Sequence, residues 1–136
     1  MKNIETKTRL INIFPAFWAA LFDIIITIYF QPKEYWDGNL KNHNEANPIG
    51  SFAMNESIYG IFVISIIWLI LILIMGLFLP KNWISYTTLF ILLCHTVGAS
   101  SWIMMHFGFN YIFILIAINS FLFLKMNYKH EMVSSS

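Results

Sequence analysis

Residues 58–79 read IYGIFVISIIWLILILIMGLFL, an apolar run without a charged residue, and Pro80 follows directly. A helix rises about 1.5 Å per residue, so roughly 20 such residues cross the ~30 Å hydrocarbon core of a bilayer. Proline cannot continue a helix, which sets the end of the run. The stretch therefore predicts a transmembrane helix and, with it, an integral membrane protein.

Other apolar runs have the length of a span, and they lie at residues 10–30, 83–105 and 109–124. None alternates polar and apolar residues as the strands of a membrane barrel do. The connections at residues 80–82 and 106–108 are short, so the helices that they join are expected to be antiparallel neighbours. We predict an all-α fold, an integral membrane four-helix bundle with a long first outer loop.

Composition supports this fold class. Hydrophobic residues make up 58% of the chain and charged residues 11%, whereas soluble domains carry roughly 25% charged residues. The lipid bilayer is therefore the first partner that we predict. The net charge of +1 gives no basic field for nucleic acid. The single cysteine, Cys94, leaves no pair for a disulfide within the chain or for a zinc site.

The positive residues are divided unevenly between the two sides that the spans define. One side carries Lys2, Lys7, Arg9, Lys81, Lys125 and Lys129, and the other carries Lys33 and Lys41. Cytoplasmic loops carry the excess of lysine and arginine. We therefore predict that both termini are cytoplasmic and that the long first loop lies outside.

Polar residues inside the spans mark candidate functional positions. A charged side chain within a span costs about 2.5 kcal/mol or more, so it usually faces a partner or a wet cavity. Asp23 is the acidic residue well inside the first span, and Thr27 and Gln31 follow it at i+4 and i+8. At this spacing the three share one helix face.

The third span carries a matching stripe. His95, Trp102 and His106 fall within roughly 40° of one another at about 100° per residue, and Gly98 leaves room for a close neighbour. We predict that His95 and Asp23 meet inside the bundle. They would share a proton, bind a metal with a third ligand, grip a polar ligand group, or form a structural hydrogen bond between helices. The metal site is the less favoured alternative and is not predicted, because histidines one turn apart with a glutamate are absent.

The remaining polar residues are read as structural or solvated. Asn119 and Ser120, in the fourth span, are expected to hold helices together, since amides in membrane helices often do so. His43 and His130 lie in polar segments and are expected to be solvated.

The chain is read as one domain, residues 1–136, with the loop at residues 31–55 and a polar tail at residues 127–136. A loop of this length in a compact domain is usually functional or disordered. Its proline, glycine and aromatic content favours an ordered lid that brings Glu45 to the polar site; a mobile loop with Glu45 in water is the alternative. Tyr35 and Trp36 are interpreted as aromatics of the membrane interface.

A resemblance appears at these residues. Asp23-Ile-Ile-Ile-Thr27, followed by Glu45-Ala-Asn47-Pro48 and an apolar helix, resembles a group of small prokaryotic membrane proteins that carry Asp-x-x-x-Thr and Glu-x-Asn-Pro. The likeness covers roughly residues 20 to 75. It implies a prokaryotic inner or plasma membrane, and it implies that these five residues belong to one site. The group has no assigned activity to transfer.

A weaker likeness lies in the layout. The four-helix domain of sterol isomerases and the sigma-2 receptor is similar in its long first loop, its acidic residues facing a cavity and its histidine in the third helix. The second span here has no carboxylate at mid-membrane, and only Glu56 lies at its mouth. This departure argues against isomerase chemistry, and fold analogy alone does not give a function.

Three functions stay open. The first is an outer-half polar pocket that binds a small ligand or exchanges protons, as a binder or an enzyme. The second is a subunit or assembly factor that binds another membrane protein, and the third is a pore made by a homo-oligomer. No catalytic residue and no cofactor follow from the sequence. The candidate pocket comprises Asp23, Thr27, Gln31, Glu45, Asn47, His95, Trp102 and His106, with the loop aromatics Tyr35 and Trp36.

Overall fold

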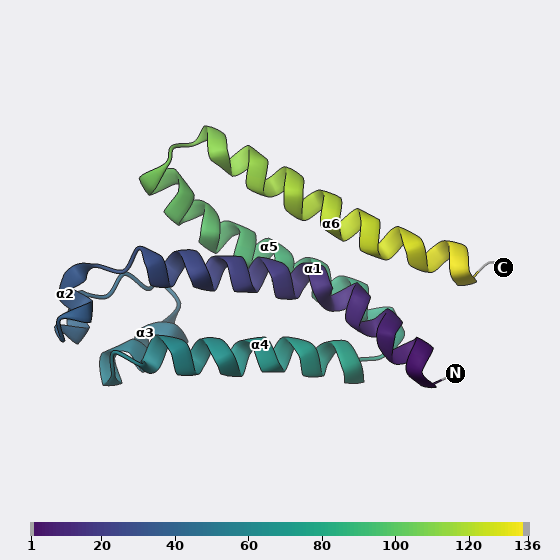
Figure 1. Ribbon diagram of the computed structural model, residues 1–136, viewed down its shortest axis with the longest axis horizontal. Helices are drawn as coiled ribbons and strands as arrows, with labels where there is room; N and C mark the ends of the chain where they lie inside the picture. Colours follow the sequence, from purple (N-terminus) through teal and green to yellow (C-terminus); the bar gives the residue numbers. More distant parts are fainter. Residues whose placement is uncertain (1, 135–136) are drawn as a thin grey trace.

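The computed structural model describes the backbone of residues 2–134 and the side chains of residues 5–126. This part of the chain is helical and contains no strand (Figure 1). The elements are α1 (Lys2–Tyr29), α2 (Lys33–Trp36), the 3-10 turn η1 (Leu40–Asn42), α3 (Pro48–Glu56), α4 (Gly60–Phe78), α5 (Lys81–His106) and α6 (Asn110–Ser134).

Three helices are long and apolar enough to cross a membrane: Glu5–Tyr29 within α1, Gly60–Phe78 and Lys81–His106. They correspond to the first three predicted spans. The apolar part of α6 is shorter and covers Asn110–Met126. The polar tail predicted at residues 127–136 continues α6 as far as Ser134, and its side chains, His130 included, lie outside those that the structure describes.

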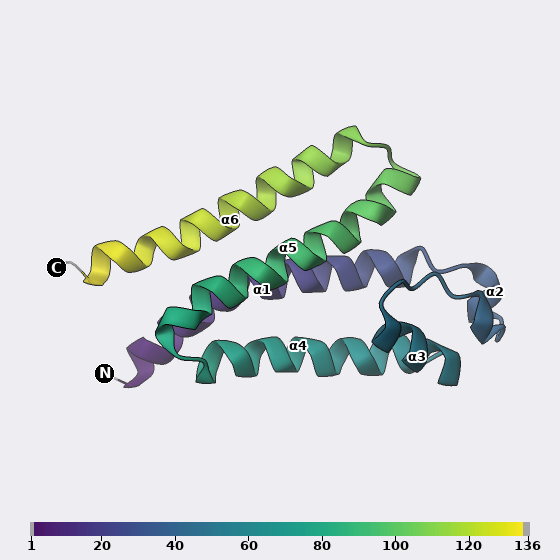
Figure 2. The same ribbon diagram turned by 180° about the vertical axis from the view of Figure 1, so that it is seen from behind.

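Helix α1 lies in the middle of the molecule. It packs against α4 on one side and against α5 and α6 on the other (Figures 1 and 2). From their short connection, α4 and α5 diverge toward the end where α2 and α3 lie. The first helix, rather than a common four-helix axis, therefore organises the packing of the others.

Small residues allow α1 to approach its neighbours closely. Ala16 and Ala20 are fully buried in a cluster with Ile13, Ile72 and Ile91, which come from α1, α4 and α5. Gly76 faces Ile13 so closely that a Cβ at Gly76 would lie 2.6 Å from the Ile13 side chain. Small residues at helix contacts are how membrane helices gain dispersion contacts without a hydrophobic driving force between them.

Charged groups join the N-terminal part of α1 to the connection between α4 and α5. The Arg9 guanidinium donates to the carbonyls of Leu77 and Leu79, at 3.2 and 2.8 Å, where α4 ends. These terminal carbonyls have no partner within a helix, so a cation near them is stabilising. Glu5 lies 3.5 Å from both Arg9 and Lys81 and ties the three together.

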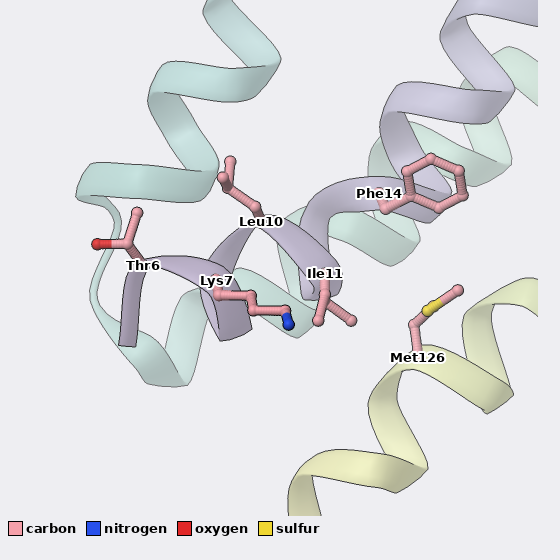
Figure 3. Close-up of a pocket in the computed structure, with 6 residues that line it drawn as sticks. All are labelled: Thr6, Lys7, Leu10, Ile11, Phe14 and Met126. Atoms are coloured by element: carbon pink, nitrogen blue, oxygen red, sulfur yellow. The ribbon is translucent and has the colours of Figure 1, made fainter. Parts of the chain in front are cut away.

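A groove of about 550 Å³ lies at this same end, between α1 and α6 (Figure 3). Its lining is mainly apolar: Thr6, Lys7, Leu10, Ile11, Phe14 and Met126. The groove lies far along α1 from the polar residues that the sequence singles out.

The segment between α1 and α4 is built from α2, η1 and α3 rather than from irregular loop. Tyr35 is fully buried among Met54 and Ile61, and its hydroxyl donates to the carbonyls of Ser57 and Ile58. The interpretation of Tyr35 as an interface aromatic is therefore wrong. A phenol can fill a core when its hydroxyl finds an acceptor, and the kink between α3 and α4 supplies two.

Candidate ligand-binding cavity

A cavity of about 910 Å³ lies between α1, α4 and α5. The segment from His43 to Gly50 contributes to its lining, so the connection before α3 forms part of the cavity wall. Residues that carry polar groups into it include Asp23, Thr27, Glu45, Ser65, Trp68 and His95. Apolar side chains such as Ile64, Leu71 and Phe90 form much of the remaining wall.

Asp23 and His95 meet in this cavity. The Oδ2 atom of Asp23 lies 2.8 Å from Nδ1 of His95, and each side chain is 17% exposed. Gly98, one turn along α5 from His95, makes room for the carboxylate, because a Cβ there would lie 2.7 Å from Oδ2. The structure thus joins the polar face of α1 to that of α5.

Trp68 completes the arrangement from α4, and the sequence reasoning missed it. Its indole Nε1–H donates to Nε2 of His95 at 2.7 Å. The candidate pocket predicted from the sequence contains no residue of the second span. The spacing of Ile61, Ser65, Trp68 and Ile72 was the available signal, because steps of four, three and four place them on one helix face.

Glu45 reaches the cavity from the segment before α3. Its Oε1 accepts the backbone N–H of Asn47 at 2.7 Å, and Asn47 Oδ1 in turn caps α3 by accepting the N–H of Ile49. A Cβ at Gly50 would lie 2.9 Å from Cγ of Glu45, so the glycine lets the side chain fold over α3. Burial raises the pKa of Glu45, and the nearby Asp23 carboxylate adds to the shift.

This raised pKa makes the stability of the segment that carries Glu45 depend on pH. A carboxyl group with a raised pKa binds its proton more tightly in the folded protein, so the stability that it contributes is full below its ordinary pKa of 4.5 and is lost as pH rises through the folded value. We expect the amides around Asn47 and Gly50 to exchange hydrogen more slowly near pH 4 than near pH 7, after correction for intrinsic rates. Hydrogen-exchange mass spectrometry measures this difference.

The Glu45→Gln variant should lose that pH difference. Glu34→Gln serves as the matched control, because Glu34 is exposed on α2 and does not line the cavity. Equal pH dependence in Glu45→Gln and the unaltered protein would contradict the assignment to Glu45.

Other predicted pocket residues divide into two groups. Thr27, Asn47 and Trp102 line the cavity, whereas Gln31 and His106 lie outside its lining. Gln31 instead exchanges two hydrogen bonds with the backbone of Asn44, at 2.8 and 3.2 Å. Helix α1 ends at Tyr29, so helical spacing does not carry the face of Asp23 on to Gln31. Gln31 therefore positions the segment that covers the cavity.

His106 is the last residue of α5 and stacks on Phe30, with 3.7 Å between the ring centroids. Trp102 stacks on the same two rings, at 6.2 Å from Phe30 and 6.0 Å from His106. This stack joins the C-terminal end of α1 to the C-terminal end of α5. His106 therefore packs against aromatic rings and, contrary to the prediction, does not line the cavity.

The structure also shows the surroundings of His43, Asn119 and Ser120. His43 is not solvated as expected: it lines the cavity, and its Nε2 lies 3.2 Å from the hydroxyl of Ser51. Asn119 donates to Thr96 at 2.7 Å and so joins α6 to α5 through a buried hydrogen bond. Ser120, its predicted companion, is exposed.

The carboxylates that line the cavity suit it to accept hydrogen bonds from a bound molecule. The titratable groups in its lining are Asp23, Glu45, His43, His95 and Cys94, and the lining contains neither lysine nor arginine. The carboxylates can accept hydrogen bonds or protons from a bound molecule. Within the described residues no group of three or more His, Cys, Asp or Glu side chains could hold a metal ion.

Comparison of this chain with protein-family models, with curated proteins and with solved structures found no match in any of the three.

Proposed function

We propose that this protein is a four-span membrane protein and that α6 is the fourth span. Its apolar part, Asn110–Met126, would cover roughly 25 Å at about 1.5 Å per residue, near the lower limit for a span. Lys125 at its end can extend its ammonium group to the interface. In support, the start of α1 and the end of α6 lie at the same end of the molecule (Figure 1), as an even number of crossings requires.

We further infer that this end faces the cytoplasm and that the cavity opens toward the outer side. The cluster of Glu5, Arg9 and Lys81 lies at the proposed inner end. The excess of lysine and arginine on that side of the spans supports this orientation.

The proposed activity is binding of a small ligand, or proton exchange, at the carboxylates of Asp23 and Glu45. The observation that carries this proposal is a 910 Å³ cavity that contains both carboxylates and no lysine or arginine. Small-molecule sites are clefts of about 300–1,000 Å³ with apolar walls and a few polar groups that fix orientation. A ligand here would present a hydrogen-bond donor or a positive charge to the carboxylates and lay its apolar part along α4 and α5.

The resemblance to the Asp-x-x-x-Thr and Glu-x-Asn-Pro group is consistent with this proposal. Asp23, Thr27, Glu45 and Asn47 contribute to one cavity lining, and Pro48 starts the helix that Asn47 caps. Residues far apart in the sequence would thus act on the same ligand.

Cys94 offers a direct test, because it is the single cysteine and it lines the cavity. A methanethiosulfonate that carries a trimethylammonium group should label it about tenfold faster than one that carries a sulfonate, since clefts of one charge sign concentrate counter-ions by tenfold or more. Labelling rates on the purified protein in detergent measure the ratio. Failure of both reagents to react with the folded protein would contradict a water-accessible cavity.

Glu45→Gln should lower this labelling ratio by about threefold or more, because it removes one of the charges that attract the cationic reagent. Glu34→Gln removes an exposed carboxylate outside the cavity and should leave the ratio unchanged. A ratio near unity in the unaltered protein would overturn the proposal that the cavity selects donors and cations.

A further inference from the structure

The hydrogen bonds of His95 determine where its proton lies. An indole N–H can donate and cannot accept, so the 2.7 Å contact from Trp68 requires Nε2 of His95 to present a lone pair. The neutral ring then carries its proton on Nδ1. That nitrogen lies 2.8 Å from Oδ2 of Asp23 and donates to the carboxylate.

Only one protonation state of His95 satisfies both contacts. An imidazolium ring would place two N–H donors against each other at the Trp68 contact. The Nε2–H tautomer would do the same, and it would also turn the Nδ1 lone pair toward a carboxylate oxygen. While the indole is seated, His95 is therefore neutral, and its Nε2 is unavailable to a ligand.

The indole is held in place by its surroundings. Trp68 packs against the buried cluster that contains Ile13, Ile72 and Ile91. Helix α4, which carries it, is fastened to α1 by the Arg9 hydrogen bonds at its last turn and by the close contact of Gly76. For the indole to leave Nε2 of His95, either α4 must move or the half-buried Trp68 side chain must adopt another rotamer.

We propose that Trp68 is a positioning residue that locks His95 in its neutral Nδ1–H tautomer. A proton, or a ligand that donates a hydrogen bond, competes with the indole for the lone pair on Nε2. Proton uptake by His95 and displacement of Trp68 are then one event. The competition with a ligand rests on the proposed function, whereas the lock itself does not.

The other titratable groups that face this site come from the elements packed around it. Helix α1 contributes Asp23, the segment before α3 contributes His43 and Glu45, and α5 contributes Cys94 beside His95. The described lining residues of α4 include no acid or base. The contribution of α4 to the protonation of His95 is therefore the indole hydrogen bond.

Nitrogen NMR of the full chain in detergent, with isotope-labelled histidine, tests the lock. Loss of one pair of ring-nitrogen signals in His95→Gln assigns His95 among the histidines. In the unaltered protein near pH 7 we expect a protonated Nδ1 and an unprotonated Nε2. Trp68→Phe keeps an aromatic ring but removes the donor, and the share of the Nε2–H tautomer should rise about three- to tenfold, the value of one net hydrogen bond.

Two further variants make the result decisive. Trp83→Phe changes a tryptophan that is 62% exposed at the start of α5 and should leave the tautomer unchanged. Asp23→Ala removes the acceptor of Nδ1–H, so the tautomer should persist if the Trp68 donor is the lock and should be lost if the carboxylate is. This variant also decides the matter if Trp68→Phe does not fold.

An Nε2–H ring in the unaltered protein, or an unchanged tautomer in folded Trp68→Phe, would overturn the proposal. Because the NMR experiment needs no ligand, its outcome is separate from that of the labelling at Cys94. A locked tautomer without charge-selective labelling would refute the proposed function alone, and the reverse result would refute the lock alone.

Discussion

Asp23→Ala is expected to lower the free energy of unfolding by about 1.5–3 kcal/mol, the usual value of a hydrogen bond to a charged group. The substitution removes the carboxylate that accepts from Nδ1 of His95 at 2.8 Å and leaves that donor mostly buried. It also removes a hydrogen bond that joins α1 to α5. Thermal unfolding in detergent, followed by circular dichroism, measures the loss.

Asp23→Asn separates the structural role of this residue from its functional role. The amide keeps an acceptor for His95 but carries no charge, so it should retain most of the stability. It should still lower the preference of Cys94 for the cationic reagent, because the cavity loses negative charge. If Asp23→Asn keeps the full labelling preference, Asp23 acts only as a hydrogen-bond partner between helices.

Gly60→Ala is expected to destabilise the protein by about 2–4 kcal/mol, near the upper end for a single substitution. A Cβ at Gly60 would lie 1.8 Å from the carbonyl oxygen of Ala53. Because the obstacle is backbone rather than the end of a flexible side chain, α3 must move away from α4. Since α3 follows the segment that carries Glu45, labelling at Cys94 should also lose its charge preference.

Val63→Ala is the matched control on the same helix. Val63 is 56% exposed on α4, so its truncation should change the free energy of unfolding by less than about 0.5 kcal/mol. A Gly60→Ala protein that unfolds like Val63→Ala would show that α3 and α4 can separate at little cost.

Helix positions and the Asp23–His95 pair could be predicted because each rests on a local property. Apolar length defines a span whatever the neighbouring helices do. Helical periodicity places Asp23 with Thr27, and His95 with Trp102, on faces that must bury their polar groups. Helix α3 was not predicted, although Asn47 followed by Pro48 is a local signal for the start of a helix.

Errors arose where a residue's partner depends on how the elements pack. Tyr35 was assigned to the membrane interface because the sequence does not reveal the two carbonyls of Ser57 and Ile58 that accept its hydroxyl. Gln31 was placed in the pocket by extending a helix that ends at Tyr29. His43 was assigned to solvent because nothing local shows that its segment folds back over the cavity.

The sequence by itself determined that the chain forms long apolar helices and that Asp23 and His95 lie on polar faces, because hydropathy and periodicity are properties of each segment alone. Tertiary structure decided that α4 packs on α1 so that Trp68 reaches Nε2 of His95. It also decided that the connection before α3 brings Glu45 to the same cavity. Most residues of α4 are apolar, so the spacing of Ser65 and Trp68 marks one face of the helix but does not say what that face contacts, and the packing of α1 and α5 decides this.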